Sequence, residues 1–387
     1  MRSNQSRILF VVISICALAS LRAVTGPDPG GRDPATRALS IFSEVLSLTR
    51  SNYVEPTDSK TLLEGAYDGM SDALDPFSFY VPAASIAAYR AQEAAGAASP
   101  GIVFARRGGY PYVVAPLPGS PAEKAGVRAG DLIDSVDGKA LRNAPIWKVK
   151  AALEGPEGSS CELGLFRGGD EKRLAISVTR ARFEPPGPST KWERDVAIIK
   201  IGTFTTATAA AVRKELEEAN RRAISKVILD LRGSIGGEVA QAAPVASLFV
   251  GSGRIATVVA RKVDARPLEA QGEAVWKGRT VLLIDDSTGG AAEVLAAALH
   301  DRAKAITVGE TTVGMAILQK NVPTEEGGSL FMTVGRYVSP SGQVLGGKGL
   351  SPDERVIVFP GENGDRDLIL ERGLEMARSE ASSRRAA

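Results

Sequence analysis

The strongest constraint on the fold is an alternation of short apolar runs and amphipathic helical patterns along the second half of the chain. In the helical patterns, apolar residues recur every three or four positions. Because this alternation is typical of parallel strands joined by helical crossovers, it predicts a mostly parallel sheet covered by helices. The expected strands span 196–201, 226–231, 255–260, 280–285 and 305–308. The expected helices span 209–221, 239–249 and 291–301.

Length and charge restrict the classes of protein to which the chain can belong. A chain of 387 residues is too long for one ordinary domain. Its 47 Lys and Arg against 45 Asp and Glu give a net charge of only +2, which argues against a nucleic-acid partner. One His and two Cys argue against a zinc site built from these ligands. We therefore expect no such zinc site, and no other metal or organic cofactor is implied.

The N-terminus carries a targeting pattern. Arg2 and Arg7 precede an apolar run over 8–18, and the small-residue pattern Ala17-Leu18-Ala19 closes it. This predicts a signal peptide or membrane anchor over 1–25, with residues 8–19 as the tether if it is not cleaved. The run is short for a membrane-spanning helix. We expect an exported protein, periplasmic or extracytoplasmic, that is either free or membrane-anchored.

Composition shifts divide the remaining chain. Pro- and Gly-rich segments at 25–36 and 184–190 are predicted linkers. We expect a helical N-terminal segment over 37–98, a separate module over 99–183, and an α/β core over 191–360. A C-terminal helix and tail over 361–387 complete the α/β multidomain architecture.

The module over 99–183 resembles a PDZ domain. Its segment GSPAEKAGVRAGDLIDSVDGKAL places Ser120 as a helix cap, proline at the first helical position and Gly126 as a stop. A helix over 146–153 and a strand ending near Arg180 follow. The resemblance implies a peptide-binding loop and strand edge that accept a polypeptide C-terminus. The residues at these positions are Gly101, Ile102, Val103 and Phe104. The alternative is a module that only braces its neighbours.

Separated motifs in a fixed order extend this resemblance to most of the chain. They are YVEP at 53–56, LDP at 74–76, the PDZ segment, LDLR at 229–232 with GG at 236–237, GE at 309–310, RYVSPSG at 336–342 and GKGLSPD at 347–353. Together they resemble the carboxyl-terminal processing peptidases, or tail-specific serine proteases. The resemblance implies a core with the ClpP/crotonase-like fold of that family. It also implies a serine nucleophile, a lysine general base, and partners that are polypeptide C-termini or unfolded proteins.

The catalytic dyad of that family is replaced in this chain. With Glu293 and 309–310 as anchors, the nucleophile position holds Gly290 and the lysine position holds Met315. Gln319 is retained, and Gly236 and Gly237 remain as the implied oxyanion turn. Glycine has no side chain that can attack, and a thioether does not accept a proton at neutral pH. The leading hypothesis is therefore a catalytically inactive homologue that binds polypeptide C-termini.

Two further interpretations stay open at this stage. The first is an active endopeptidase with a relocated nucleophile, for which the candidates are Ser287, Thr288 and Ser234. Lys320 is expected on the opposite strand face from position 315, and His300 is expected to meet the C-terminal end of its helix. The second is a purely structural role in which the PDZ module binds nothing. A nucleotide site at the glycine turn 233–237 is disfavoured because its spacing fits neither common phosphate-binding motif.

Overall fold

The computed structural model describes residues 33–96, 98–168, 172–358 and 366–379. The predicted signal peptide or anchor over 1–25 and the predicted tail end lie outside these residues. None of the helices in the described ranges combines the length and the apolarity that a membrane span requires. The described residues divide into two compact units, one up to residue 66 and one from residue 67.

Helices dominate the N-terminal segment, as the sequence predicts. Helix α2 is Pro34–Asn52, and α3 is Ser59–Asp72. Helix α2 begins three residues before the expected start at 37, with proline in its first turn, where the missing N–H costs nothing. A short strand, β1 (Phe79–Val81), and helix α4 (Ala83–Ala95) follow. The sequence analysis did not predict β1.

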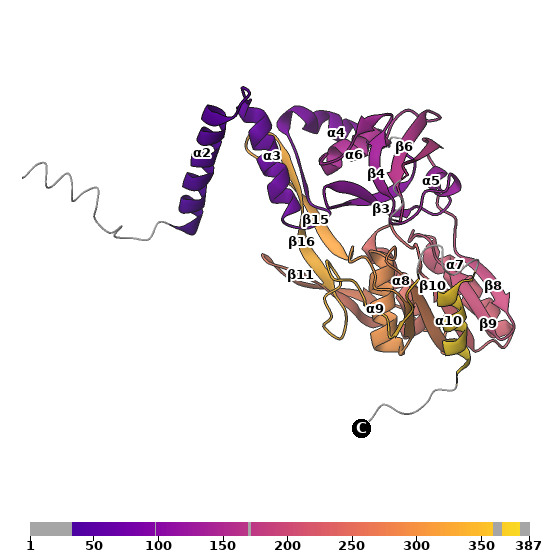
Figure 1. The fold of residues 1–387 in the computed structure, drawn as a ribbon. Helices are drawn as coiled ribbons and strands as arrows, with labels where there is room; N and C mark the ends of the chain where they lie inside the picture. Colours follow the sequence, from indigo (N-terminus) through magenta and orange to yellow (C-terminus); the bar gives the residue numbers. More distant parts are fainter. Residues whose placement is uncertain (1–32, 97, 169–171, 359–365, 380–387) are drawn as a thin grey trace, which may run out of the picture. The chain divides into compact units, whose positions relative to one another are not determined.

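The predicted parallel sheet forms the centre of the core (Figure 1). Its strand order is β17-β14-β13-β10-β9-β8, and all neighbours are parallel except β8 and β9. The strands are β8 Ser189–Glu193, β9 Val196–Lys200, β10 Lys226–Asp230, β13 Arg279–Ile284, β14 Ile306–Gly309 and β17 Glu354–Arg355. The helices are α7 Thr208–Arg221, α8 Ala242–Val250, α9 Ala291–Ala303 and α10 Leu368–Arg378, with a 3₁₀ turn at Val239–Gln241.

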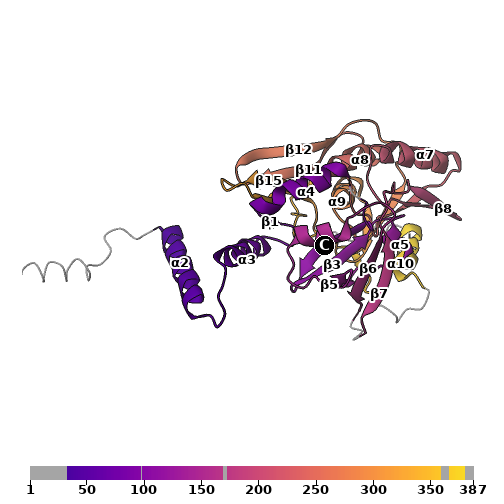
Figure 2. The same ribbon diagram turned by 90° about the horizontal axis from the view of Figure 1, so that it is seen from above.

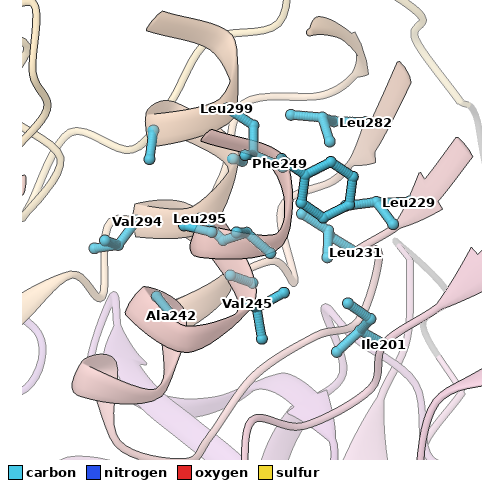
Figure 3. Close-up of a cluster of buried hydrophobic side chains, with 14 of the residues drawn as sticks. Ile201, Leu229, Leu231, Ala242, Val245, Phe249, Leu282, Val294, Leu295 and Leu299 are labelled. Atoms are coloured by element: carbon cyan, nitrogen blue, oxygen red, sulfur yellow. The ribbon is translucent and has the colours of Figure 1, made fainter. Parts of the chain in front are cut away.

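Both faces of the sheet are buried, because alternate side chains of these strands pack against helices on opposite sides. On one face, Leu229 and Leu282 pack with α7, α8 and α9, and Figure 3 shows Phe249 of α8 among them. On the other face, Ile228 and Leu283 pack against α10. Burial on both faces explains why these strands read as continuous apolar runs in the sequence.

One predicted strand lies in a different sheet. The expectation that 255–260 extends the parallel sheet is wrong, because β11 (Gly253–Ala260) pairs antiparallel with β12 (Val263–Ala270) and with β16 (Ser329–Val338). A tight turn at 261–262 returns the chain directly, so a hairpin forms instead of a crossover. Strands β1 and β15 (Ile317–Pro323) complete this sheet by pairing with β16.

The module between the linkers has its own sheet and its own core. Its order is β2-β3-β4-β6-β7, with β5 on β4, and its strands β3, β5, β6 and β7 lie together in Figure 2. The strands are β2 Ile102–Arg107, β3 Tyr110–Pro116, β4 Leu132–Val136, β5 Lys139–Ala140, β6 Ser160–Phe166 and β7 Leu174–Thr179. The helices are α5 Pro121–Lys124 and α6 Ile146–Leu153. Ser120 caps α5 by accepting the amide of Glu123 at 3.1 Å, as predicted. Strand β2 forms one edge of this sheet.

Candidate active site

A cleft of about 330 Å³ lies where three turns of the core meet the PDZ-like module. It brings together Gly236, Gly237, Gly290, Met315 and Gln319, all of which the sequence assigned to one site. Phe104 of β2 is the one predicted peptide-binding residue that lines it. Sequence reasoning did not find the other lining residues, which are Phe77, Phe79, Ile146, Ile235, Val239 and Ile317.

Gly290 occupies the position between strand β13 and helix α9, directly before the first helical residue. Its backbone has φ 61° and ψ −114°, a conformation that side-chain-bearing residues rarely adopt. A Cβ built here would meet no atom within 4 Å. The position therefore has room for a side chain, and the strain of adding one would come from the backbone.

Glu293 connects this position to the turn that carries Met315. It is fully buried, and its carboxylate accepts the amide of Gly290 at 3.0 Å, the amide of Gly314 at 2.5 Å and the hydroxyl of Thr312 at 2.6 Å. Burial raises the pKa of Glu293 to about 7, although these hydrogen bonds favour the charged form. The sequence analysis used Glu293 only as an anchor. Its place three residues after the helix cap is the signal that would have indicated the bond to Gly290.

Further hydrogen bonds hold the glycine turn and the Gly290 turn together. The carboxylate of Asp285 accepts the amide of Gly233 at 3.1 Å and the hydroxyl of Thr288 at 2.9 Å. The amide of Gly289 donates to the carbonyl of Ser234 at 2.9 Å. Burial raises the pKa of Asp285 above its ordinary value. The floor of the cleft is thus a rigid assembly of turns.

Gly237 is fixed in the glycine turn by close packing. Its φ is 81°, and a Cβ on it would lie 2.0 Å from the carbonyl oxygen of Phe204. Gly236, with φ 89°, is less confined, because a Cβ there would meet Leu117 at 3.4 Å. Only glycine fits position 237, so the turn keeps its backbone close to position 290.

Met315, which precedes β15, and Ile317 and Gln319 within β15 line the cleft at alternate positions. The intervening Leu318 and the following Lys320 are exposed and do not line it, in agreement with the predicted orientation of Lys320. The side-chain amide nitrogen (Nε2) of Gln319 donates to the backbone carbonyl oxygen of Phe77 at 2.9 Å. Gln319 therefore holds the segment before β1 against the cleft.

The candidate replacement nucleophiles do not reach the cleft. The hydroxyl oxygen of Thr288 lies 2.9 Å from both the carbonyl oxygen of Leu231 and the carboxylate of Asp285, so these two acceptors share its one hydrogen. Ser287 is 4% exposed and contacts Asp286, and Ser234 is fully buried. None of the three lines the cleft.

His300 contacts two aspartates and does not line the cleft. Its ring nitrogens contact Asp301 at 3.1 Å and Asp353 at 3.2 Å. The bond to Asp353 and that to Asp301 raise the pKa of His300 to about 9. His300 thus connects the end of α9 to the loop before β17, away from the cleft.

The predicted peptide-binding residues lie at the start of the edge strand β2. Gly101 has φ 77°, and a Cβ there would lie 2.4 Å from Cβ of Ser120. Val103 packs against a cluster that includes Ile235 of the glycine turn. The module is therefore in contact with the floor of the cleft.

Comparisons with known proteins give consistent results. Residues 195–356 match peptidase family S41, and residues 112–167 match the PDZ domain. The chain is 28% identical over 363 residues to the carboxy-terminal processing protease CtpA of Bacillus subtilis, covering 90% of this chain and 77% of that protein. It is also 28% identical over 354 residues to a carboxy-terminal-processing protease of Bartonella bacilliformis, covering 90% and 82%.

A solved structure is similar over most of the chain. The photosystem II D1 C-terminal processing protease matches with a TM-score of 0.66 and 26% identity, covering 82% of this chain and 92% of that one. These matches confirm the expected fold class, with an N-terminal helical segment, a PDZ domain and an α/β core.

Proposed function

We propose that this chain, which joins a core that matches peptidase family S41 to a module that matches the PDZ domain, is a catalytically inactive member of the carboxyl-terminal processing peptidases that binds polypeptide C-termini. The observation that carries the proposal is the cleft itself. The two positions that the resemblance assigns to the dyad hold Gly290 and Met315, and Glu293 accepts hydrogen bonds from the amides of Gly290 and Gly314 beside them.

The lining of the cleft supports inactivity. Among the residues that the structure describes there, Gln319 is the one polar side chain, and no hydroxyl, thiol, amine, imidazole or carboxylate joins it. Loss of a hydrolytic dyad lowers turnover by roughly 10⁴–10⁶. The relocated-nucleophile alternative has no support in the geometry, because Ser287, Thr288 and Ser234 are buried outside the cleft.

The edge position of β2 supports binding. A PDZ domain accepts a peptide as an extra strand, which requires a sheet edge with free backbone groups. Strand β2 is hydrogen-bonded to β3 on one side and ends the sheet on the other. The two curated relatives quoted above are named for processing at carboxyl termini, which fits a C-terminal ligand for this chain as well.

A cleavage assay tests inactivity. Protein lacking residues 1–25 and a Gly290→Ser/Met315→Lys variant are incubated with an unfolded polypeptide that has an apolar C-terminus, and fragments are detected by mass spectrometry. We expect no cleavage by the native chain and cleavage by the double variant, because position 290 has room for a side chain. Reproducible cleavage by the native chain would refute inactivity.

A binding assay tests the ligand class. Short peptides with apolar C-termini should bind with dissociation constants of roughly tens to hundreds of micromolar, typical of about −6 kcal/mol. Amidating the terminal carboxylate should abolish binding. Binding that survives amidation contradicts C-terminal recognition, and no saturable binding supports the structural alternative.

We propose, finally, that the protein acts outside the cytoplasm. The proposal rests on the basic and apolar pattern of residues 2–19. Cell fractionation of the full chain and of a chain lacking residues 1–25 tests it. Equal cytoplasmic retention of both would contradict export.

A further inference from the structure

The cleft is continuous with the peptide edge of the PDZ domain. Phe104 lies on β2, and Ile146 is the first residue of α6, so the two elements between which a PDZ ligand lies both contribute to the cleft wall. Met315 and Gly290 of the core form other parts of the same wall. A polypeptide added to β2 therefore runs past the former catalytic position.

Strand geometry gives the distance along such a peptide. A strand rises about 3.3 Å per residue, and alternate side chains share a face. If the terminal residue lies opposite Ile102, an antiparallel peptide places the residue two positions upstream opposite Phe104. The side chains that meet the cleft then belong to residues about two to four positions before the C-terminus.

The chemistry of the cleft selects the type of side chain. Its walls are aliphatic and aromatic, and among the described lining residues none carries a charge. The amide of Gln319 is already bonded to the carbonyl of Phe77. A charged side chain would lose its hydration here without gaining a partner, whereas an apolar one would gain by burial.

The residues at positions 315 and 290 make the cleft apolar and open. A lysine at position 315 would bring an ammonium group into the cleft, and methionine brings a flexible thioether that packs against apolar groups. Gly290 leaves open space beside it, since no atom lies within 4 Å of an added Cβ.

We propose that the vacated catalytic cleft is a second recognition pocket, which takes an apolar side chain two to four residues upstream of the bound C-terminus, with Met315 as a specificity-determining residue. This proposal rests on the proposed C-terminal binding. It adds that the same residues that remove catalysis create a preference for a particular ligand sequence.

The test measures the affinities of peptides that share one apolar C-terminal residue and carry a single leucine at successive upstream positions in a serine and alanine background. We expect leucine at one position in the stated range to tighten binding about tenfold. A photoreactive leucine at that position should crosslink to residues of the cleft wall, which mass spectrometry can locate.

Substitution of Met315 separates this pocket from the PDZ groove. Met315→Asp should remove the tenfold preference and Met315→Leu should keep it. Leu318→Asp is the matched control, because Leu318 lies close to Met315 in the chain, is 40% exposed and is outside the cleft. Leu318→Asp should bind the peptides with and without the upstream leucine as the native chain does, and Met315→Leu should still bind the leucine peptide, results that an unfolded variant would not give.

The outcomes distinguish the two proposals. Carboxylate-dependent binding that is insensitive to leucine at every upstream position overturns the second pocket and leaves the proposed function intact. A leucine preference that persists in Met315→Asp overturns the role of Met315. Loss of carboxylate dependence overturns the proposed function and, with it, the pocket.

Discussion

Replacing Glu293 with glutamine should change how the stability of this protein depends on pH. Glu293 is fully buried between the turn at Gly290 and the turn at Gly314, and its pKa is raised from 4.5 to about 7. In the unfolded chain the carboxyl group ionises near its ordinary value. Between these two pKa values the folded protein holds a proton that the unfolded chain has lost.

The sign and size of the effect follow from this difference. A raised carboxyl pKa contributes stability that is fully present below 4.5 and lost as pH rises through about 7. A shift of this size corresponds to about 3 kcal/mol. Glutamine cannot ionise, so the free energy of unfolding of the variant, relative to the native chain, should rise by about 3 kcal/mol between pH 4 and 8.

Urea unfolding at a series of pH values measures this difference. Other groups whose pKa is raised, such as Asp285 and His300, contribute equally to both proteins and cancel. The exposed Glu326, changed to glutamine, is the matched control and should show no such trend. A difference between Glu293→Gln and the native chain that stays constant across this pH range would refute the reasoning.

Other substitutions test the packing and the charges described above. Gly237→Ala should lower the free energy of unfolding by at least ~2 kcal/mol, because the added Cβ would meet the carbonyl oxygen of Phe204. Gly236→Ala should lower the melting temperature by less than Gly237→Ala, because position 236 is less confined. Leu216→Ala, fully buried on α7, should cost about 2–5 kcal/mol in urea unfolding, whereas a cost below ~1 kcal/mol would contradict its place in the core. The charged His300 should contribute to the free energy of unfolding in full below pH 6.5, and this contribution should be lost as pH rises through about 9. His300→Gln should remove this loss in pH-dependent melts.

The elements that the sequence predicted well are those with locally visible patterns. Strands β9, β10 and β13 are buried on both faces, so each appears in the sequence as a continuous apolar run that predicts a strand. Strand β15 is mostly exposed and carries polar residues, so no periodicity marks it. Strand β1 has only three residues and exists because β16 pairs with it.

The same division applies to the site. Gly290 and Met315 could be found because Glu293 and the 309–310 motif fix the alignment at short range. Phe77 and Phe79 could not, because they reach the cleft through the pairing of β1 with β16 and the bond from Gln319. Pairing between distant segments leaves no local pattern in the sequence.

The pairing of β1 with β16 also sets the order in which the molecule can assemble. The rings of Phe79 and Phe331 stack with centroids 4.7 Å apart, although roughly 250 residues separate them in the chain. At a synthesis rate of about 5–20 residues per second, the ribosome adds Phe331 on the order of tens of seconds after Phe79. The PDZ domain, encoded between them with its own core, can fold during that interval. The pairing that completes the aromatic wall of the cleft therefore forms after the PDZ domain has had time to fold.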